Sequence, residues 1–188
     1  MAVYTKINKK DISIINNKFD IEKIVSFQGI KKGIENTNYL LKSNNKKFIL
    51  TIFEKRVSNK EIPFFMKLMA ELNHAKIICP KPLKNNDGNY LIKLKNKTAC
   101  IVSFLEGKDK NKLNSKNCFE VGKIIAQVHS VTKNIKISRK NSMGIKNLDP
   151  LLKSIKFKSK KFNNLEKFLI NNLKDIKKNW PKKLPNGI

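Results

Sequence analysis

A short glycine-containing stretch holds the residues of this sequence that could bind an anion. Gly33 is followed by Asn36, Thr37 and Asn38, just ahead of an apolar run. Because glycine has no Cβ, a loop of this kind can bring several backbone N–H groups close to a phosphate. The same residue types are also typical of a plain turn between two strands, and taken alone they favour that turn. The stretch by itself therefore leaves a phosphate-binding loop and an ordinary hairpin turn both open.

Single titratable residues add little further chemistry. His129 ends an apolar helical stretch, where we expect a structural, hydrogen-bonded role, and His74 lies among polar residues and is expected to be solvated. Glu35, Glu54 and Glu106 are possible site residues. A lone carboxylate in a loop or at a strand end is usually a surface group, so we expect these three to lie in solvent.

Strands are predicted on both sides of the glycine-containing stretch. Residues 21–30, 36–43 and 46–56 are typical of three strands in sequence, and residues 9–18 predict a short helix before them. The third strand is apolar on both of its faces, which indicates a strand that is covered on both sides. Its apolar residues are Phe48, Ile49, Leu50, Ile52 and Phe53.

A helix and a further hairpin are predicted next. Ser58 and Glu61 have the spacing of a capping box, in which the two side chains satisfy free amides at a helix start. The helix that they would begin has one apolar face. Asp87-Gly88 then predicts the turn of a hairpin, because glycine tolerates positive φ, and the hairpin leads to a buried strand at residues 99–105.

Helices dominate the rest of the chain. A helix beginning at residue 115 has an apolar stripe that includes Val121, Ile124 and Ile125, and a final amphipathic helix is expected at about residues 163–180. Strands followed by helices indicate an α+β fold. We predict two lobes: residues 1–105 form an antiparallel sheet with one packed helix, and residues 106–188 form an incomplete helical lobe.

The net charge of +27 does not by itself indicate a nucleic-acid-binding protein. Only Arg56 and Arg139 of the 41 basic residues are arginines, and the lysines are spread through almost every polar stretch. Sites that read bases or bind phosphate in a bidentate manner favour arginine. We therefore expect no specific nucleic-acid partner, and a basic nucleic-acid-binding module stays as the alternative from a different functional class.

The cysteines and the N-terminus indicate a cytoplasmic protein. Cys79, Cys100 and Cys118 lie in apolar contexts without metal-binding or redox spacing, and we expect them to be reduced residues of the core. The first fifteen residues do not have the pattern of a secretion signal, and no apolar run is long enough to span a bilayer. We expect no membrane partner, and the sequence does not predict the oligomeric state.

Seven segments, taken in order, carry a family resemblance. They are "MAVYTKI", "GIENTNYLL", "FILTIFEKR", "EIPFFMKLMAEL", "CPKPL", "ACIVSFLEG" and "EVGKIIAQVHS". Over nearly all of residues 1–135 the chain resembles the bacterial homoserine kinases of the aminoglycoside phosphotransferase and choline-kinase-like superfamily. The resemblance implies a protein-kinase-like fold and transfer of the γ-phosphoryl group of ATP to the hydroxyl of L-homoserine, in threonine biosynthesis, with Mg²⁺ as the bridging ion. A kinase of another small alcohol or amino sugar is the nearest alternative.

The resemblance also implies roles for individual residues. Gly33, Asn36 and Asn38 would lie in the loop over the phosphates. Thr51 stands where many superfamily members carry a phosphate-binding Lys or Arg, so the cation that would contact the phosphates is not identified. The strand that would meet adenine consists of Val102, Ser103, Phe104 and Leu105.

The catalytic motif of the superfamily does not occur in this sequence. That motif is approximately His-x-Asp-x-x-x-x-Asn, followed later by a metal-binding aspartate. The C-terminal segment "LPNGI" resembles the residues that lead into it. We therefore assign no catalytic and no metal-binding residue to this chain. We expect an inactive N-terminal fragment whose metal ligands belong to a missing C-terminal part.

Overall fold

A computed structural model describes residues 3–55, 57–141, 144–155 and 163–181. The chain forms two compact units, Met1–Ile137 and Ser138–Ile188. The sheet, the helices that cover it and the candidate site all belong to the first unit. The predicted boundary after residue 105 divides a nucleotide-binding lobe from a helical lobe, and it stays a prediction.

Five antiparallel strands form one sheet in the order β1-β2-β3-β5-β4. The register places Asn38, Thr51 and Cys100 side by side on three adjacent strands. The central position of β3 explains why its sequence is apolar on both faces. The strands are β1 Ser26–Gly29, β2 Thr37–Lys42, β3 Lys47–Ile52, β4 Leu91–Leu94 and β5 Lys97–Ser103.

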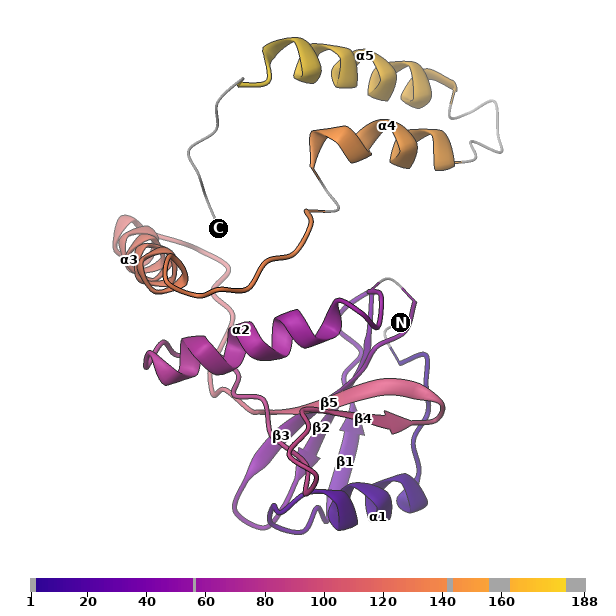
Figure 1. The fold of residues 1–188 in the computed structure, drawn as a ribbon, viewed down its shortest axis with the longest axis vertical. Coiled ribbons are helices and arrows are strands. Elements are labelled where there is room, and N and C mark those ends of the chain that lie inside the picture. The colour runs from indigo at the N-terminus through magenta and orange to yellow at the C-terminus, as the bar shows by residue number, and fades with distance from the viewer. Residues whose placement is uncertain (1–2, 56, 142–143, 156–162, 182–188) are drawn as a thin grey trace. The chain divides into compact units, whose positions relative to one another are not determined.

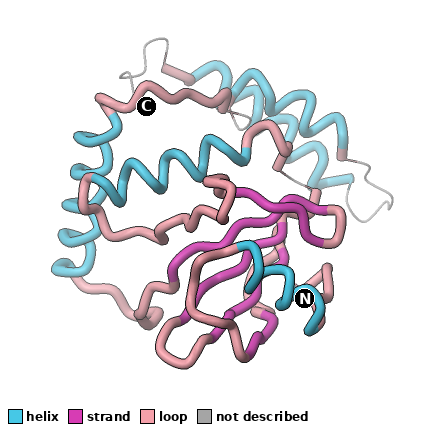
Figure 2. The backbone as a smooth tube through the Cα atoms, turned by 60° about the horizontal axis from the view of Figure 1, so that its bottom comes forward, coloured by secondary structure: helices cyan, strands magenta, loops and turns pink. Residues whose placement is uncertain are grey.

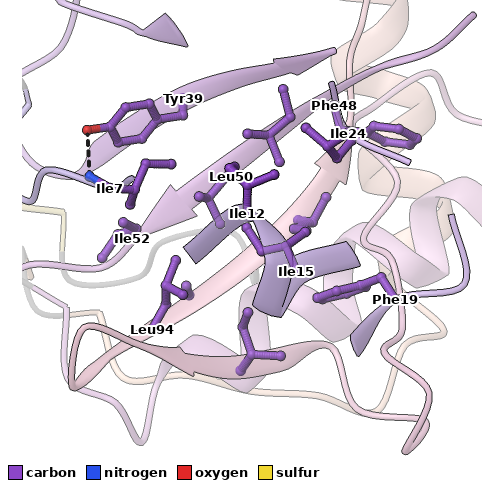
Figure 3. Close-up of a cluster of buried hydrophobic side chains, with 14 residues drawn as sticks. Ile7, Ile12, Ile15, Phe19, Ile24, Tyr39, Phe48, Leu50, Ile52 and Leu94 are labelled. Atoms are coloured by element: carbon purple, nitrogen blue, oxygen red, sulfur yellow. Dashed lines mark hydrogen bonds between the residues drawn. The ribbon is translucent and has the colours of Figure 1, made fainter. Parts of the chain in front are cut away.

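One face of the sheet is covered by α1 (Lys9–Lys18), as predicted for residues 9–18. Asn8 caps this helix, since its side chain accepts from the N–H of Asp11 and the Asp11 carboxylate accepts from the N–H of Asn8. Ile12 and Ile15 of the helix lie in the main hydrophobic core, which Figure 3 shows. Alternate residues of β3 face the same core: Phe48, Leu50 and Ile52.

The opposite face is covered by α2 (Ile62–His74), so the sheet lies between two helices (Figures 1 and 2). Ile62 and Met66 of α2 pack with Cys100 and Val102 of β5. The predicted packed helix is α2, and α1 adds a second helix on the other face.

The predicted start of α2 is wrong. The helix begins at Ile62, and its N-cap residue Glu61 makes no side-chain cap hydrogen bond. Ser58 instead begins a turn, in which its C=O accepts from the N–H of Glu61 at 2.9 Å. A serine three residues before a glutamate can begin a turn as well as a helix, and Pro63 then favours a helix that starts beside it.

The predicted hairpin turn is also wrong. The strands β4 and β5 are joined by Lys95 and Asn96, which have φ angles of 51° and 60°. Gly88 has a φ of 78° but lies before β4, outside the hairpin. Positive φ at both central residues is the requirement of the commonest two-residue hairpin turn, and here a lysine and an asparagine meet it without glycine.

The helix α3 (Ser115–Thr132) completes the regular structure of the first unit. Its predicted apolar stripe is largely uncovered: Val121, Ile124 and Ile125 are 58%, 49% and 50% exposed. Among the described residues, no helix is long and apolar enough to cross a membrane.

The second unit contains α4 (Ile145–Ser154) and α5 (Asn163–Asn179). An ion pair between Asp149 and Lys177 connects the two helices. Leu173 of α5 is buried, while other members of the predicted apolar face are exposed, with Phe168 at 61%. The amphipathic helix predicted at about residues 163–180 is thus present, and much of its apolar face is uncovered.

Candidate functional site

A cleft of about 480 Å³ opens on the α2 side of the sheet. Side chains from β2, β3, β5 and α2 line it, together with residues that follow β1 and β5. Six of the eight residues predicted for the site take part in this lining. They are Asn38, Thr51, Val102, Ser103, Phe104 and Leu105.

Most of the cleft wall is apolar. Ile49 of β3 lies in the lining together with Phe65 and Met69 of α2. Cys100 of β5 also lines the cleft but is only 1% exposed. Burial raises the pKa of this thiol to about 12, although a backbone hydrogen bond from Thr51 acts in the opposite direction. The wall therefore suits a flat, largely apolar group better than a charged one.

The strand β5 ends beside the cleft with a free peptide edge. The N–H of Ser103 donates to the C=O of Lys81, and the N–H of Phe104 donates to the C=O of Lys47. Beyond that point, the N–H and C=O of Leu105 have no hydrogen-bond partner within the described part of the chain. A donor and an acceptor next to an apolar slot can pair with the edge of a planar heterocycle.

The polar side chains that line the cleft are neutral. The Thr51 hydroxyl donates to Oδ1 of Asn38 at 2.8 Å, which links β3 and β2 across the cleft floor. Among the described residues that line the cleft, none is charged. Thr51 therefore lines the cleft with a hydroxyl and no charge, and its predicted place beside the phosphates stays a prediction.

Gly33 and Asn36 do not line the cleft. The loop that contains them, residues 30–36, connects β1 with β2, and its ends meet where the N–H of Ile30 donates to the C=O of Asn38 at 2.8 Å. Gly33 has a φ of 120°, which side chains rarely allow. The Asn36 side chain accepts from the N–H of Glu54 at 3.4 Å. The position of this loop over phosphates stays a prediction.

The expectation that Glu54 is a surface group is wrong. Its side chain is 9% exposed and forms an ion pair with Lys97. Its Oε1 accepts from the hydroxyls of Thr5 at 2.7 Å and Thr37 at 2.6 Å. Burial acts to raise the pKa of Glu54, but hydrogen bonds from Lys97, Thr37 and Thr5 and the charge of Lys97 outweigh it. The net effect is a pKa below the ordinary value, so the group is a carboxylate at neutral pH.

A sequence signal for the burial of Glu54 was present. Strand side chains alternate, and Leu50 and Ile52 both face the α1 side of the sheet. Glu54 continues that spacing by two residues beyond Ile52. A carboxylate at the next inward position predicts a buried polar cluster, provided that partners such as Thr37 are in reach.

The structure confirms the expected exposure of Glu106 and contradicts the role expected for His129. Glu106 is exposed, as expected, and pairs with Lys47 at 2.7 Å. Glu35 is half-buried. His129 is exposed, and its ring forms no hydrogen bond within the described residues, so the structural role expected for it is wrong. An ion pair between Lys32 and Asp109 connects residues 30–36 to the segment after β5.

The described residues contain no group of three His, Cys, Asp or Glu side chains that could hold a metal ion. The donors that line the cleft are an amide and two hydroxyls, whereas Mg²⁺ is usually held by carboxylates and phosphate oxygens. These residues therefore do not fit a magnesium site on their own.

Comparison with curated proteins finds relatives along the whole chain. The homoserine kinase of Bartonella tribocorum is 36% identical over an alignment of 191 residues, which covers 100% of this chain and 59% of that protein. The homoserine kinase of Parvibaculum lavamentivorans is 34% identical over 189 residues, with coverage of 100% and 59%. The chain thus spans about three fifths of the length of these relatives.

Solved structures of low sequence identity share the fold. A spectinomycin phosphotransferase in complex with ADP and spectinomycin matches with a TM-score of 0.62 and 14% identity, over 97% of this chain and 60% of that one. A microcompartment-associated aminopropanol kinase matches with a TM-score of 0.59 and 15% identity, over 76% and 47%. These neighbours confirm the predicted α+β, kinase-like fold. Because residues 26–188 also match the model of the Phosphotransferase enzyme family, this chain belongs to that family.

Proposed function

We propose that the chain is the nucleotide-binding part of a homoserine kinase. In the reaction, the hydroxyl oxygen of L-homoserine forms a bond with the γ-phosphorus of ATP. The bond from that phosphorus to the β,γ-bridging oxygen breaks, which releases ADP, and the hydroxyl proton is lost. The observation that carries the proposal is the cleft that joins six predicted residues to a free peptide edge. The proposal places the protein in threonine biosynthesis and, given its three free cysteines, in the cytoplasm.

The cleft suits adenine because of its shape and its free peptide groups. The N–H of Leu105 can donate to the Watson–Crick edge of the base and its C=O can accept from that edge, and both groups lack a partner within the described residues. Ile49 and Met69 offer apolar contacts to the faces of the ring. A base bound in this way would point its ribose and phosphates toward Asn38 and Thr51.

The acceptor is assigned from the relatives. The homoserine kinases that match this chain cover it completely, whereas the aminopropanol kinase and the spectinomycin phosphotransferase match it at 14–15% identity. We therefore propose L-homoserine first, and a small alcohol or amino sugar as the alternative. The lining of the cleft contains no ammonium-binding carboxylate for either kind of substrate.

The catalytic groups are expected outside these 188 residues. The neutral cleft does not fit Mg²⁺, so we propose that the ion arrives with ATP and is held by carboxylates of a further part of the enzyme. Positioning without that charge leaves out the main electrostatic contribution to phosphoryl transfer. For this reason we expect nucleotide binding, and no phosphoryl transfer, from this chain alone.

Hydrogen exchange with and without ADP tests the nucleotide site. Bound ADP should protect residues 29–38 and 100–106, while α1 on the opposite face serves as the internal control. Leu105→Pro should weaken ADP binding about fivefold to tenfold, because it removes one hydrogen-bond donor worth about 1 kcal/mol. Leu105→Ala is the control, since it removes most of the leucine side chain and keeps the N–H.

The rival proposal of a basic nucleic-acid-binding module predicts a different result. Such a module would bind arbitrary DNA or RNA with an affinity that falls steeply with salt, and ADP would protect neither segment. ADP protection at 0.15 M salt together with weak, salt-sensitive DNA binding supports the kinase. Strong DNA or RNA binding that falls steeply with salt, without protection by ADP, rejects the kinase.

A further inference from the structure

The loop between β1 and β2 is held from the face opposite the cleft. Thr37, the first residue of β2, is fully buried, and its hydroxyl accepts from the N–H groups of Tyr4 at 2.9 Å and Thr5 at 3.1 Å. The same hydroxyl donates to Glu54, which also pairs with Lys97. We call Thr5, Thr37, Glu54 and Lys97 the loop brace.

The loop brace acts on residues that border the cleft. Successive side chains of a strand point to opposite faces of the sheet. Thr37 therefore lies on the α1 side, with Tyr39 and Leu41, while its neighbour Asn38 lines the cleft on the α2 side. Two more contacts hold the loop before Thr37. The Tyr4 hydroxyl donates to the C=O of Ile34 at 3.0 Å, and the N–H of Glu54 donates to the Asn36 side chain.

The chemistry of the loop brace indicates a geometric role. A carboxylate that is largely removed from solvent, as Glu54 is, loses hydration and needs charge pairing and hydrogen bonds, and apolar residues of similar size would often stabilise a fold as well or better. The preceding inward positions of the same strand, Leu50 and Ile52, are apolar. Glu54 instead joins three chain segments through directional bonds, which fix where the loop ends and β2 begins.

We propose that Glu54 is a positioning residue for nucleotide phosphates. Through Thr37 it holds the β1–β2 loop in the shape in which Asn38 and the loop amides meet the phosphates. This inference rests on the proposed function, because it needs a nucleotide in the cleft. It concerns the phosphates alone, since the base would contact the strand end around Leu105.

Paired ligands separate this role from general stability. Thr37→Val removes the hydroxyl at constant shape and should weaken ADP binding about tenfold, as expected if the competent loop falls to about a tenth of the population. Adenosine, titrated to millimolar concentration, should bind with unchanged affinity because it has no phosphate. Thr37→Ser restores the hydroxyl and should restore ADP affinity. Glu54→Gln, which removes the charge that pairs with Lys97, should follow Thr37→Val in direction.

Glu22→Gln is the matched control at the far end of the same strands. Glu22 also holds a turn through its carboxylate, accepting from the Ser43 hydroxyl at 3.0 Å and the N–H of Asn45 at 3.2 Å. Its loss should leave ADP binding unchanged. All variants are first compared by circular dichroism and thermal unfolding at equal concentration.

Three outcomes are distinguishable. Selective loss of ADP affinity in Thr37→Val and Glu54→Gln, with adenosine unaffected, supports the proposal. Wild-type ADP affinity in both variants, or equal loss of ADP and adenosine, overturns the positioning role and leaves the proposed function standing. A wild-type chain that binds neither ligand at 0.15 M salt overturns the proposed function, and the positioning role with it.

Discussion

Thiol labelling tests how the cleft is built. The perturbation is alkylation of the native chain with iodoacetamide at pH 8, in which the three free cysteines act as references for one another. Cys118 is exposed on α3 and Cys79 is half-buried, so the expectation that they lie in the core is wrong, whereas Cys100 is 1% exposed at the edge of the cleft. Burial raises the pKa of Cys100 from 9.0 to about 12. Burial also raises the pKa of Cys79. Since the thiolate is the nucleophile, low access and weak ionisation slow Cys100 most.

The magnitude follows from the pKa. At pH 8 about a tenth of an ordinary thiol is ionised, against about one part in ten thousand for a thiol with a pKa near 12, so Cys100 should react about a thousandfold more slowly than an ordinary thiol. Peptide mass spectrometry after timed quenching gives the three rates. In guanidinium chloride the three rates should converge, which is the control for local sequence effects. Native labelling of Cys100 within tenfold of Cys118 would refute the packing of α2 over β5.

Two further measurements address the core and the loop brace. Leu50→Ala should cost about 2–5 kcal/mol in urea unfolding because Leu50 is fully buried, whereas Ile34→Ala, at an 80% exposed site, should change the free energy by less than about 0.5 kcal/mol. Because the pKa of Glu54 is lowered in the folded chain, its carboxylate adds stability above its ordinary pKa of 4.5, and this is lost as pH falls through the folded value. The free energy of unfolding of wild type should therefore drop more steeply than that of Glu54→Gln below about pH 4.5, and parallel curves would contradict the pairing.

Periodic patterns made most of the fold predictable. The alternation along β3 and the helical spacing of α2 indicate which elements form, because both depend on burial that repeats along the chain. Local signals were less reliable where two structures compete for the same residues. The spacing of Ser58 and Glu61 suits a turn as well as a helix cap. Asp87-Gly88 and Lys95-Asn96 can each supply positive φ for a turn, and only the second pair joins the two strands of the hairpin.

The candidate site was predictable in part for a related reason. Six of eight predicted residues line one cleft: four lie on strands whose register fixes their neighbours, and Phe104 and Leu105 directly follow β5. Gly33 and Asn36 lie in a loop, where spacing along the chain does not determine the position of a side chain. The covered position of Glu54 was not predicted, because a single carboxylate does not indicate burial unless the alternation of Leu50 and Ile52 before it is taken into account. The free peptide groups of Leu105 depend on where β5 stops pairing with its neighbours, which sequence patterns locate only within a few residues.

The net charge and the contacts in the cleft would both contribute to the affinity for a nucleotide, and salt separates the two contributions. A chain with a net charge of +27 attracts every polyanion, so ATP binding at low salt reports the lysines as much as the cleft. At 0.15 M ionic strength the screening length is about 8 Å, which removes most of that long-range attraction and leaves short-range contacts. The cleft lining is neutral, so the proposed selectivity for a nucleotide would have to come from shape and from hydrogen bonds to the base. An effect of Leu105→Pro should therefore persist as salt increases, whereas the total affinity for the triphosphate falls. A nucleotide site in this chain is defined by the part of the affinity that salt does not remove.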